Sequence, residues 1–366
     1  MELIQTVVTV FLFFFILGSL VVFHELGHFV TARLAGVRVL EFGIGFPPRA
    51  KVLRSGGETL YTLNWLPIGG FVRLEGEDGD DGDDPRSFVN AGIPKRLVIL
   101  LAGVGMNLVA AFLIFTSIAW LATPLVGARI VDGTDPGSPA EQIGLQAGDA
   151  IRRVDGEAFE FYGPSLVQVL RDKAGQTVTL EVDRASGARE TLSVTLRPPE
   201  QLGPRVGPLG IGVPIGYYYG EYVGRDFGEA IGIGATETAR WFGLILAGLG
   251  QIVGSFIADP TAPPQAAGPV GIATQIGDVF FNAGPILTLY VAAILSANLA
   301  LVNALPFPPL DGGRMLMIVL KRALGQRISL RAERLTYVVG FVFLFAFLIW
   351  VTGFDIARGL GGGATP

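Results

Sequence analysis

Four long, uncharged apolar segments divide the chain. The first covers residues 3–23, and its 21 positions are about the number that one helix needs to cross the hydrocarbon core of a bilayer. The other three lie within residues 97–128, 279–310 and 335–354. In the third segment, residues 286–305 form the core of the expected helix. The pattern therefore predicts four transmembrane helices.

A fifth uncharged segment, residues 241–258, is also long enough to span a bilayer, but the charges of the loops argue against it. Residues 306–334 contain six Lys or Arg and two acids, and the loop after the first span contains nine Lys or Arg. Cytoplasmic loops carry an excess of such basic residues. Both loops lie in the cytoplasm only if an even number of spans separates them. We therefore expect residues 241–258 to lie on or partly in the membrane surface.

The composition agrees with a polytopic membrane protein. The mean hydropathy is +0.52 and only 16% of the residues are charged, which is too apolar for an ordinary soluble domain. The net charge of −5 is modest and the acids are concentrated in one run, so no nucleic-acid-binding surface is indicated. The absence of cysteine excludes disulfides and thiolate metal sites.

The first apolar segment runs into the sequence His24-Glu25-Leu26-Gly27-His28. On a helix, residues four apart lie on one face, so both imidazoles can reach one tetrahedral zinc ion. Glu25 then lies beside them, where it can take a proton from a metal-activated water. The chain has two histidines and both are here. The pattern indicates a zinc peptidase; the alternative is a pair of histidines that pack on a helix face beside an incidental glutamate.

A catalytic zinc ion needs a third protein ligand and an open position for water. No third histidine exists, so the ligand must be an acid. Glu41 in the first loop is one candidate. Asp311 is the better one, because the topology places it on the cytoplasmic side at the end of the third span, where the His-Glu-x-x-His sequence also lies. The alternative for Asp311 is a turn acid at a helix end.

The first loop contains turn signals and one alternating segment, residues 59–63, which predicts an edge strand in a hairpin close to the membrane. An unpaired strand near an active site could hold a substrate by backbone hydrogen bonds, but a plain connecting hairpin fits the pattern equally well. The acidic run at residues 75–84 fails the spacing of a calcium-binding EF-hand loop, so we expect a solvated loop there.

Residues 127–197 differ from the rest because charges return and short β-like segments appear. We expect a helix near residues 165–172 and two alternating strands at 177–182 and 190–194. The sequence from Gly137-Ser138-Pro139-Ala140 to Val154-Asp155-Gly156 closely resembles a PDZ domain of the bacterial protease type. The resemblance implies a groove that takes peptides between a strand and a helix. The alternative is a steric gate that reads no sequence.

Taken together, the motifs resemble those of the site-2 protease family of intramembrane zinc metalloproteases. The resemblance rests on the His-Glu-x-x-His sequence in the first span, the inserted PDZ-like segment, and Asn303-x-x-Pro306-x-Pro308-x-Leu310-Asp311-Gly312 after the third span. It implies that His24, His28 and Asp311 hold zinc and that Glu25 is the base. It further implies that Asn303 helps to hold substrate or the oxyanion. The first loop, with Gly43 and Gly45, would form a membrane-reentrant β element that orders substrate as a strand.

We therefore expect a polytopic α-helical membrane protein with four transmembrane helices, a membrane-associated β element and an inserted, β-rich PDZ domain. The first two helices and the β loop would occupy residues 1–125 and the PDZ domain residues 126–200. A linker and a membrane-surface helix would follow at 201–278, and the last two helices at 279–366.

The expected function is intramembrane zinc-dependent proteolysis of single-span membrane proteins, such as anti-sigma factors and signal-peptide remnants. The resemblance places the protein in a bacterial cytoplasmic membrane, with the PDZ domain outside and the active site near the cytoplasmic face. The expected partners are the substrate, the lipid bilayer and a peptide ligand of the PDZ domain, without nucleic acid. One alternative is a membrane-bound PDZ adaptor with an inactive metal site. A zinc carrier would need ligands along several spans, and the sequence has no such series.

Overall fold

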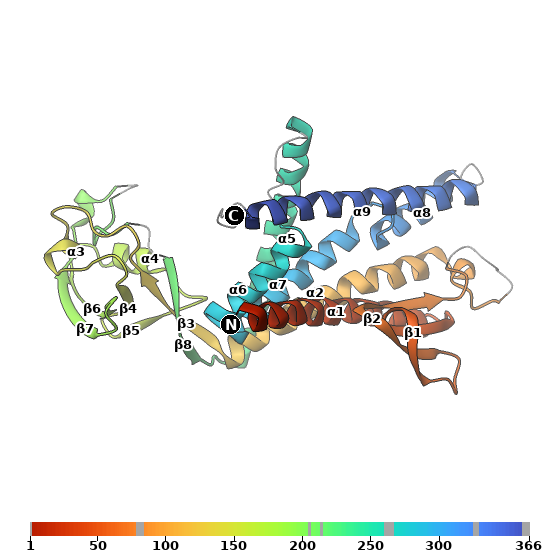
Figure 1. Cartoon of the computed structure of the whole chain (residues 1–366), viewed down its shortest axis with the longest axis horizontal. Coiled ribbons are helices and arrows are strands. Elements are labelled where there is room, and N and C mark those ends of the chain that lie inside the picture. The colour runs from red at the N-terminus through yellow and green to blue at the C-terminus, as the bar shows by residue number, and fades with distance from the viewer. Residues whose placement is uncertain are drawn as a thin grey trace. The chain divides into compact units, whose positions relative to one another are not determined.

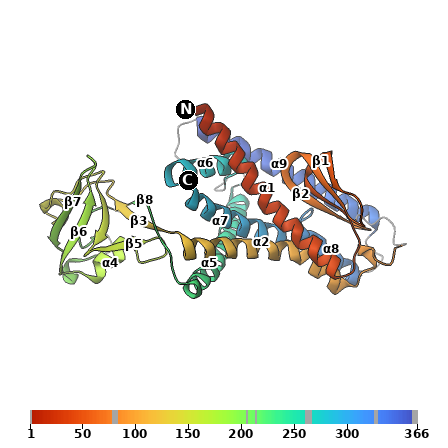
Figure 2. The ribbon, with the colours of Figure 1, turned by 90° about the horizontal axis from the view of Figure 1, so that it is seen from below.

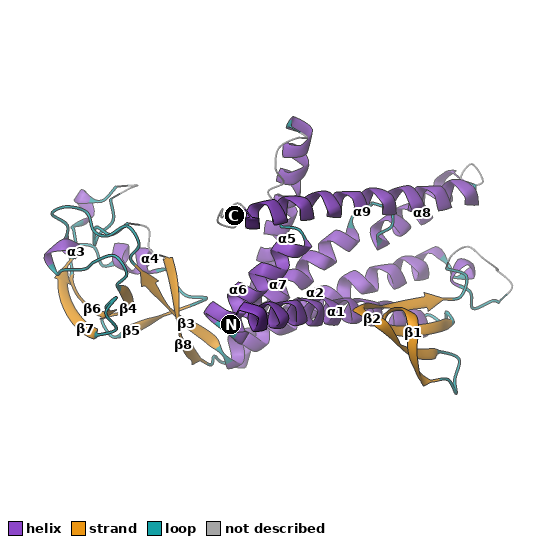
Figure 3. Cartoon of the chain, in the orientation of Figure 1, coloured by secondary structure: helices purple, strands orange, loops and turns teal. Residues whose placement is uncertain are grey.

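The computed structural model describes residues 2–77, 84–203, 206–212, 215–259, 267–324 and 329–360. They fall into two compact units. The helical unit comprises Met1–Thr116 and Gly234–Pro366, and the β unit comprises Ser117–Ile233. Figure 3 shows that helices dominate the first unit and strands the second.

Four helices are long and apolar enough to cross a membrane (Figure 1). They are α1 (Glu2–Leu34), α2 (Ile93–Leu121), α7 (Pro285–Ala304) and α9 (Leu330–Leu360). Each one coincides with one of the four apolar segments of the sequence, so the predicted number of membrane helices is confirmed.

The boundaries of two of these helices differ from the prediction. Helix α1 continues through the His-Glu-x-x-His sequence to Leu34, so this sequence lies inside the helix rather than at its end. Helix α2 ends at Leu121, and Thr123–Arg129 form strand β3 although they belong to the same uncharged segment. Pro124 has no N–H to continue a helix, which explains why a helix cannot extend over the whole segment.

The third apolar segment is divided between two helices, and the second of them, α7, coincides with the expected core at residues 286–305. Helix α6 (Pro269–Ala283) ends at Gly284, and α7 begins at Pro285. Gly284 has φ = 85°, a conformation that glycine adopts readily, and its N–H donates to the carbonyls of α6. Pro285 lacks an N–H and therefore fits the first position of a new helix.

Helix α5 (Phe227–Ala258) contains residues 241–258 and begins well before them. It is not one of the four helices selected as candidate spans from length and composition among the described residues. Helix α8 (Asp311–Leu324) is short and begins at the acid that the sequence singled out. The middle of the acidic run, residues 78–83, lies outside the described residues.

The first loop forms an antiparallel β sheet from β1 (Val39–Arg54) and β2 (Leu60–Leu74), and β2 packs against α1 (Figure 2). The predicted hairpin is thus confirmed, but its edge is not residues 59–63. Thr62 pairs with Gly43 on one side and with Val52 on the other, because both strands bend back along each other. Residues 70–74 of β2 pair with β1 on one side only, so they form an edge of this sheet.

The β unit contains a six-stranded sheet with the strand order β7-β6-β4-β5-β3-β8. Besides β3, its strands are β4 (Ala150–Val154), β5 (Glu157–Glu160), β6 (Thr177–Asp183), β7 (Arg189–Thr195) and β8 (Ile215–Val223). The short helices α3 (Pro139–Gln142) and α4 (Leu166–Asp172) belong to this unit, and Ser138 and Ser165 cap their first turns. A core that includes Ile130, Ile151 and Leu180 fills the interior.

The helix at residues 165–172 and the two alternating strands lie where the sequence predicted them. Strand β8 was not predicted, because residues 201–278 were expected to form a linker and a surface helix. It pairs antiparallel with β3 and therefore belongs to the β unit.

Candidate metal centre and active site

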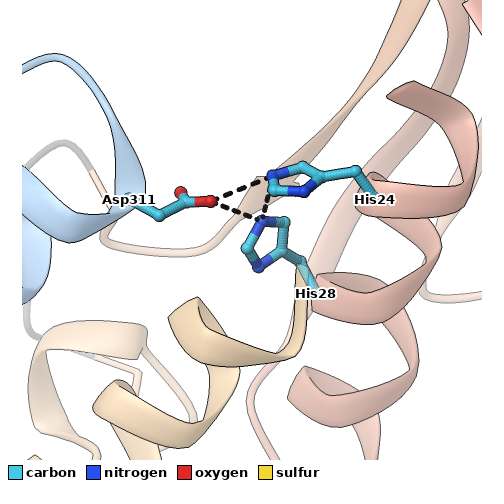
Figure 4. Close-up of side chains that lie close together, drawn as sticks. All are labelled: His24, His28 and Asp311. Carbon is cyan, nitrogen blue, oxygen red and sulfur yellow. Dashed lines mark hydrogen bonds and ion pairs between the residues drawn. The ribbon is translucent and has the colours of Figure 1, made fainter. Parts of the chain in front are cut away.

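Two helices from opposite ends of the sequence bring three metal-ligating groups together in the helical unit (Figure 4). His24 Nε2 lies 2.9 Å from Asp311 Oδ2, and His28 Nε2 lies 3.3 Å from the same oxygen. The two Nε2 atoms are 3.1 Å apart. Helix α1 places the imidazoles one turn apart on one face, and the N-terminal residue of α8 supplies the carboxylate.

A hydrogen bond indicates which nitrogen of His28 carries the proton. Its Nδ1 lies 2.8 Å from the carbonyl oxygen of Ile99 on α2, which can only accept, so Nδ1 donates. In the neutral ring, Nε2 then presents a lone pair to His24 and to the carboxylate. Asp311 Oδ2 is buried and has no hydrogen-bond partner within the part of the chain that the structure describes. Nε2 of His28 and Oδ2 of Asp311 are therefore both acceptors, and they lie 3.3 Å apart without a donor between them.

A divalent cation fits this arrangement. Nitrogen ligands at the usual zinc distance lie about 3.3 Å apart in a tetrahedral site, which is close to the observed separations. The charged groups in the cavity lining are Glu25, Glu77, Asp311 and Arg314. With neutral imidazoles, three carboxylates and one guanidinium leave a formal charge of −2, which a divalent ion would neutralise. Neutrality matters here because unpaired charge is expensive in an apolar surrounding.

The three groups line a cavity of about 380 Å³. Glu25 lies in the lining, and its carboxylate accepts a hydrogen bond of 3.1 Å from the backbone N–H of Val72 in β2. Val72 belongs to the edge segment of the sheet, and Gly70 and Phe71 line the same cavity. The free edge of a strand and a carboxylate next to a metal-binding cluster therefore share one space.

Two glycines allow α1 and α2 to approach closely at this cluster. A Cβ atom at Gly103 would lie 2.4 Å from His28 Nε2 and 2.7 Å from His24 Cε1. A Cβ atom at Gly27 would lie 2.4 Å from the carbonyl oxygen of Ala102. These distances are too short for non-bonded atoms, so a larger residue at position 103 would displace the imidazoles and one at position 27 would push α2 away from α1. Gly103 thus lies in the second membrane helix directly against the two histidines.

Of the other site residues proposed from the sequence, one lines the cavity and three do not. Asn303, near the end of α7, lies in the cavity lining, as its expected role requires. Gly43 and Gly45 lie in β1 and are not part of the lining; a Cβ at either one would collide with β2. Glu41 is buried in the sheet, where it accepts hydrogen bonds from Arg49 and Thr62 rather than joining the metal-binding cluster.

The sequence did not single out Glu77 or Arg314. Glu77 belongs to the run that was expected to be solvated, but its side chain is largely buried and forms an ion pair with Arg314 in the cavity lining. Burial disfavours the charged guanidinium, yet the neighbouring Glu77 and Asp311 carboxylates outweigh this effect and raise the pKa of Arg314 above its usual range. The only available signal was the position of Arg314 one helical turn after Asp311.

The fold and the site define a membrane protein with a cluster suited to zinc and a carboxylate beside it, as in zinc peptidases. Residues 12–347 match peptidase family M50. The chain is 32% identical to a putative zinc metalloprotease of Clostridium perfringens, over 93% of this chain and 96% of that protein. It is 27% identical to the zinc metalloprotease RasP of Geobacillus kaustophilus (97% and 99% covered) and to the regulator of sigma-W protease RasP of Bacillus subtilis (96% and 98% covered).

The chain therefore belongs to peptidase family M50, the site-2 protease family that the motifs resemble. It is a zinc metalloprotease of the membrane. Zinc as the cofactor is thereby confirmed as well.

Proposed function

We propose that this protein cleaves transmembrane segments of single-span membrane proteins, with His24, His28 and Asp311 as the zinc ligands and Glu25 as the general base. The observation that carries the proposal is the convergence of these three ligand groups beside Glu25 in one cavity of the helical unit. When bound, zinc supplies a Lewis acid that polarises a carbonyl and lowers the pKa of water. Glu25 takes a proton from the attacking water and passes it to the leaving amine.

The hydrogen bond from Val72 positions this base. Its N–H donates to Glu25 and points away from the partner strand, toward the free edge of β2. A substrate segment that pairs with residues 70–74 would pass directly in front of Glu25. Pairing of this kind needs an unwound substrate, because a helix hides its carbonyls from attack and unpaired backbone groups are expensive in lipid. The hairpin supplies the partners that such a segment would otherwise lack.

Asn303 is positioned to hold the substrate carbonyl or the developing oxyanion, because its side chain shares the cavity with Glu25 and Asp311. Gly43 and Gly45 act indirectly. They let β1 and β2 lie close enough together to present the edge at residues 70–74.

The β unit is proposed to be a PDZ domain that selects or gates substrates outside the cytoplasm. Support comes from its six-stranded sheet, its two capped helices, and the tight turn at Asp155, whose φ is 52°. The bacterial relatives favour a location in the cytoplasmic membrane. The basic residues of the first loop and of residues 306–334 support an active site near the cytoplasmic face. The similarity to a regulator of sigma-W protease favours substrates such as anti-sigma factors.

The test is cleavage of a tagged single-span substrate by the full-length enzyme in detergent or vesicles. Glu25→Gln should retain zinc and lose activity by about 10⁴-fold or more, because the proton acceptor is gone while the ligands remain. Asp311→Ala should lose both zinc and activity. Full activity of Glu25→Gln would disprove the mechanism. A wild-type protein that holds no zinc and cleaves nothing would favour the alternative, a PDZ adaptor with an inactive site.

A further inference from the structure

Asn107 on α2 has an unexplained polar group beside the metal-binding cluster. The residue is fully buried, and its Nδ2 atom lies 3.3 Å from Nδ1 of His24. Its Oδ1 atom is buried and has no hydrogen-bond partner in the described residues. Buried amide oxygens are rarely left unpaired in folded proteins.

The neighbouring imidazole has the complementary need. His24 directs Nε2 toward His28 and Asp311, so in a zinc-bound ring the proton must be on Nδ1. That N–H needs an acceptor, whereas the amide nitrogen of Asn107 is a donor. Turning the amide by half a turn exchanges its oxygen and nitrogen without moving another residue. Oδ1 then accepts from Nδ1–H of His24, and Nδ2 takes the former position of Oδ1.

We propose that Asn107 is a positioning residue that fixes the ring and the tautomer of His24 for zinc. The inference rests on the proposed function, because it assumes that His24 is a ligand. It gives the two imidazoles equivalent support: His28 donates to the carbonyl of Ile99, and His24 donates to the side chain of Asn107, both on α2. Partners of this kind orient metal-binding histidines and are worth about 10–100-fold in metal affinity.

The backbone of Asn107 is held independently of its amide. The hydroxyl of Ser296 on α7 donates to the carbonyl oxygen of Asn107 with a distance of 2.8 Å. Ser296 thus anchors α2 against α7 at this level without touching the histidines. The backbone and the side chain of Asn107 can therefore be tested separately. Asn107→Leu removes the amide and keeps a similar volume. Ser296→Ala is the control, because it removes only the hydrogen bond to the backbone.

The first experiment measures zinc affinity of the full-length protein in detergent by competition with a chelator. Asn107→Leu should bind zinc about 10–100-fold more weakly than wild type, whereas Ser296→Ala and Asn107→Asp should stay within about threefold. The aspartate retains an oxygen that accepts from Nδ1–H, so it should rescue the affinity. If Asn107 had only a packing role, leucine would fill the space and preserve the zinc affinity, and aspartate would bind zinc no more tightly than leucine.

The second experiment reads the tautomer directly. The chain contains two histidines, so protein labelled with ¹⁵N-histidine reports only on this site. In the zinc-free wild type, both rings should be protonated at Nδ1. In Asn107→Leu, His24 should become a mixture of tautomers while His28, held by Ile99, stays unchanged. Protonation of His24 at Nε2 in the wild type would overturn the inference.

The outcomes separate the two proposals. If His24→Ala loses zinc and Asn107→Leu binds it as tightly as wild type, the zinc site stands and the role of Asn107 is wrong. If His24→Ala binds as much zinc as wild type, the proposed zinc site itself is wrong. Should Asn107→Leu fail to fold, a folded Asn107→Asp that binds as weakly as His24→Ala would still overturn the positioning role.

Discussion

Two buried carboxylates, one in each unit, differ in how they are satisfied. Asp149 in the β unit accepts hydrogen bonds from Arg184 and from the backbone N–H groups of Gln146 and Ala185. Asp311 in the helical unit faces two imidazole nitrogens and has one oxygen without a hydrogen-bond partner among the described residues. A buried acid with a full set of donors stabilises a fold. A buried acid that lacks its donors marks the place of a ligand.

The largest predicted effect concerns the close approach of α2 to His24 and His28. Gly103→Ala would place a methyl group against His28 Nε2, so we expect a loss of zinc and a decrease of about 100-fold or more in substrate cleavage. Gly105→Ala is the matched control on the same helix, because nothing lies within 4 Å of a Cβ at that position. Zinc content and cleavage rate are the measurements. Equal behaviour of the two variants would show that the close approach of α2 has no role.

A smaller effect is expected at the ion pair of Glu77 and Arg314. Replacing either one with Gln leaves the other charge unpaired beside the cluster, and we expect about a tenfold decrease in cleavage rate. The double variant should recover part of the loss, with a coupling of about 1–3 kcal/mol in a double-mutant cycle.

Glu75→Gln is the control for this cycle, because Glu75 pairs with Arg38 and does not line the cavity. Additive losses in the double variant would mean that the two charges act separately. A loss in Glu75→Gln as large as that in Glu77→Gln would point to the loop as a whole rather than to the cavity.

The smallest predicted effect concerns stability alone. Burial tends to raise the pKa of Asp149, but hydrogen bonds from Arg184 and two backbone N–H groups outweigh it and keep the pKa below its ordinary value. Asp149→Asn should therefore destabilise the β unit by about 1–3 kcal/mol at neutral pH without loss of zinc. Thermal unfolding of the full-length protein and its zinc content are the measurements.

The pH dependence of this difference follows from the sign of the shift. A carboxyl group whose pKa is lower in the folded state contributes its full stability above the unfolded pKa of about 3.9. This contribution is lost as the pH falls from that value through the folded pKa. The advantage of wild type over Asp149→Asn should therefore shrink below about pH 4. Asp155 is exposed; its carboxylate pairs with Lys173 and accepts one hydrogen bond from the backbone N–H of Thr179, so Asp155→Asn should change the stability less than Asp149→Asn. A pH-independent difference at Asp149 would contradict this account.

The sequence predicted the parts of the site that depend on local spacing. The turn of α1 alone brings His24 and His28 together, and the charges of the loops were enough to place Asp311 on their side of the membrane. The hairpin and strands β6 and β7 of the β unit followed from alternation. Even the break at Gly284 had a signal, because a Gly-Pro pair interrupts the third apolar segment.

The parts that were missed depend on contacts between distant segments. Glu77 could not be separated from the other acids of its run, because its partner Arg314 lies far along the chain. The edge of the sheet was assigned to residues 59–63. Alternation does not show that residues 61–63 pair with two different parts of β1, one on each side. For the same reason, Asn107 was not singled out, because its neighbour His24 lies on another helix.

The origin of the ligand groups has a consequence for biosynthesis. The two imidazoles lie on α1 and the carboxylate lies on α8, which is synthesised after α1, α2 and α7. A nascent chain holds an incomplete set of ligands until α8 has been made and folded against α1. With the proposed ligand set, hydrolytic activity therefore cannot arise in a polypeptide that lacks α8.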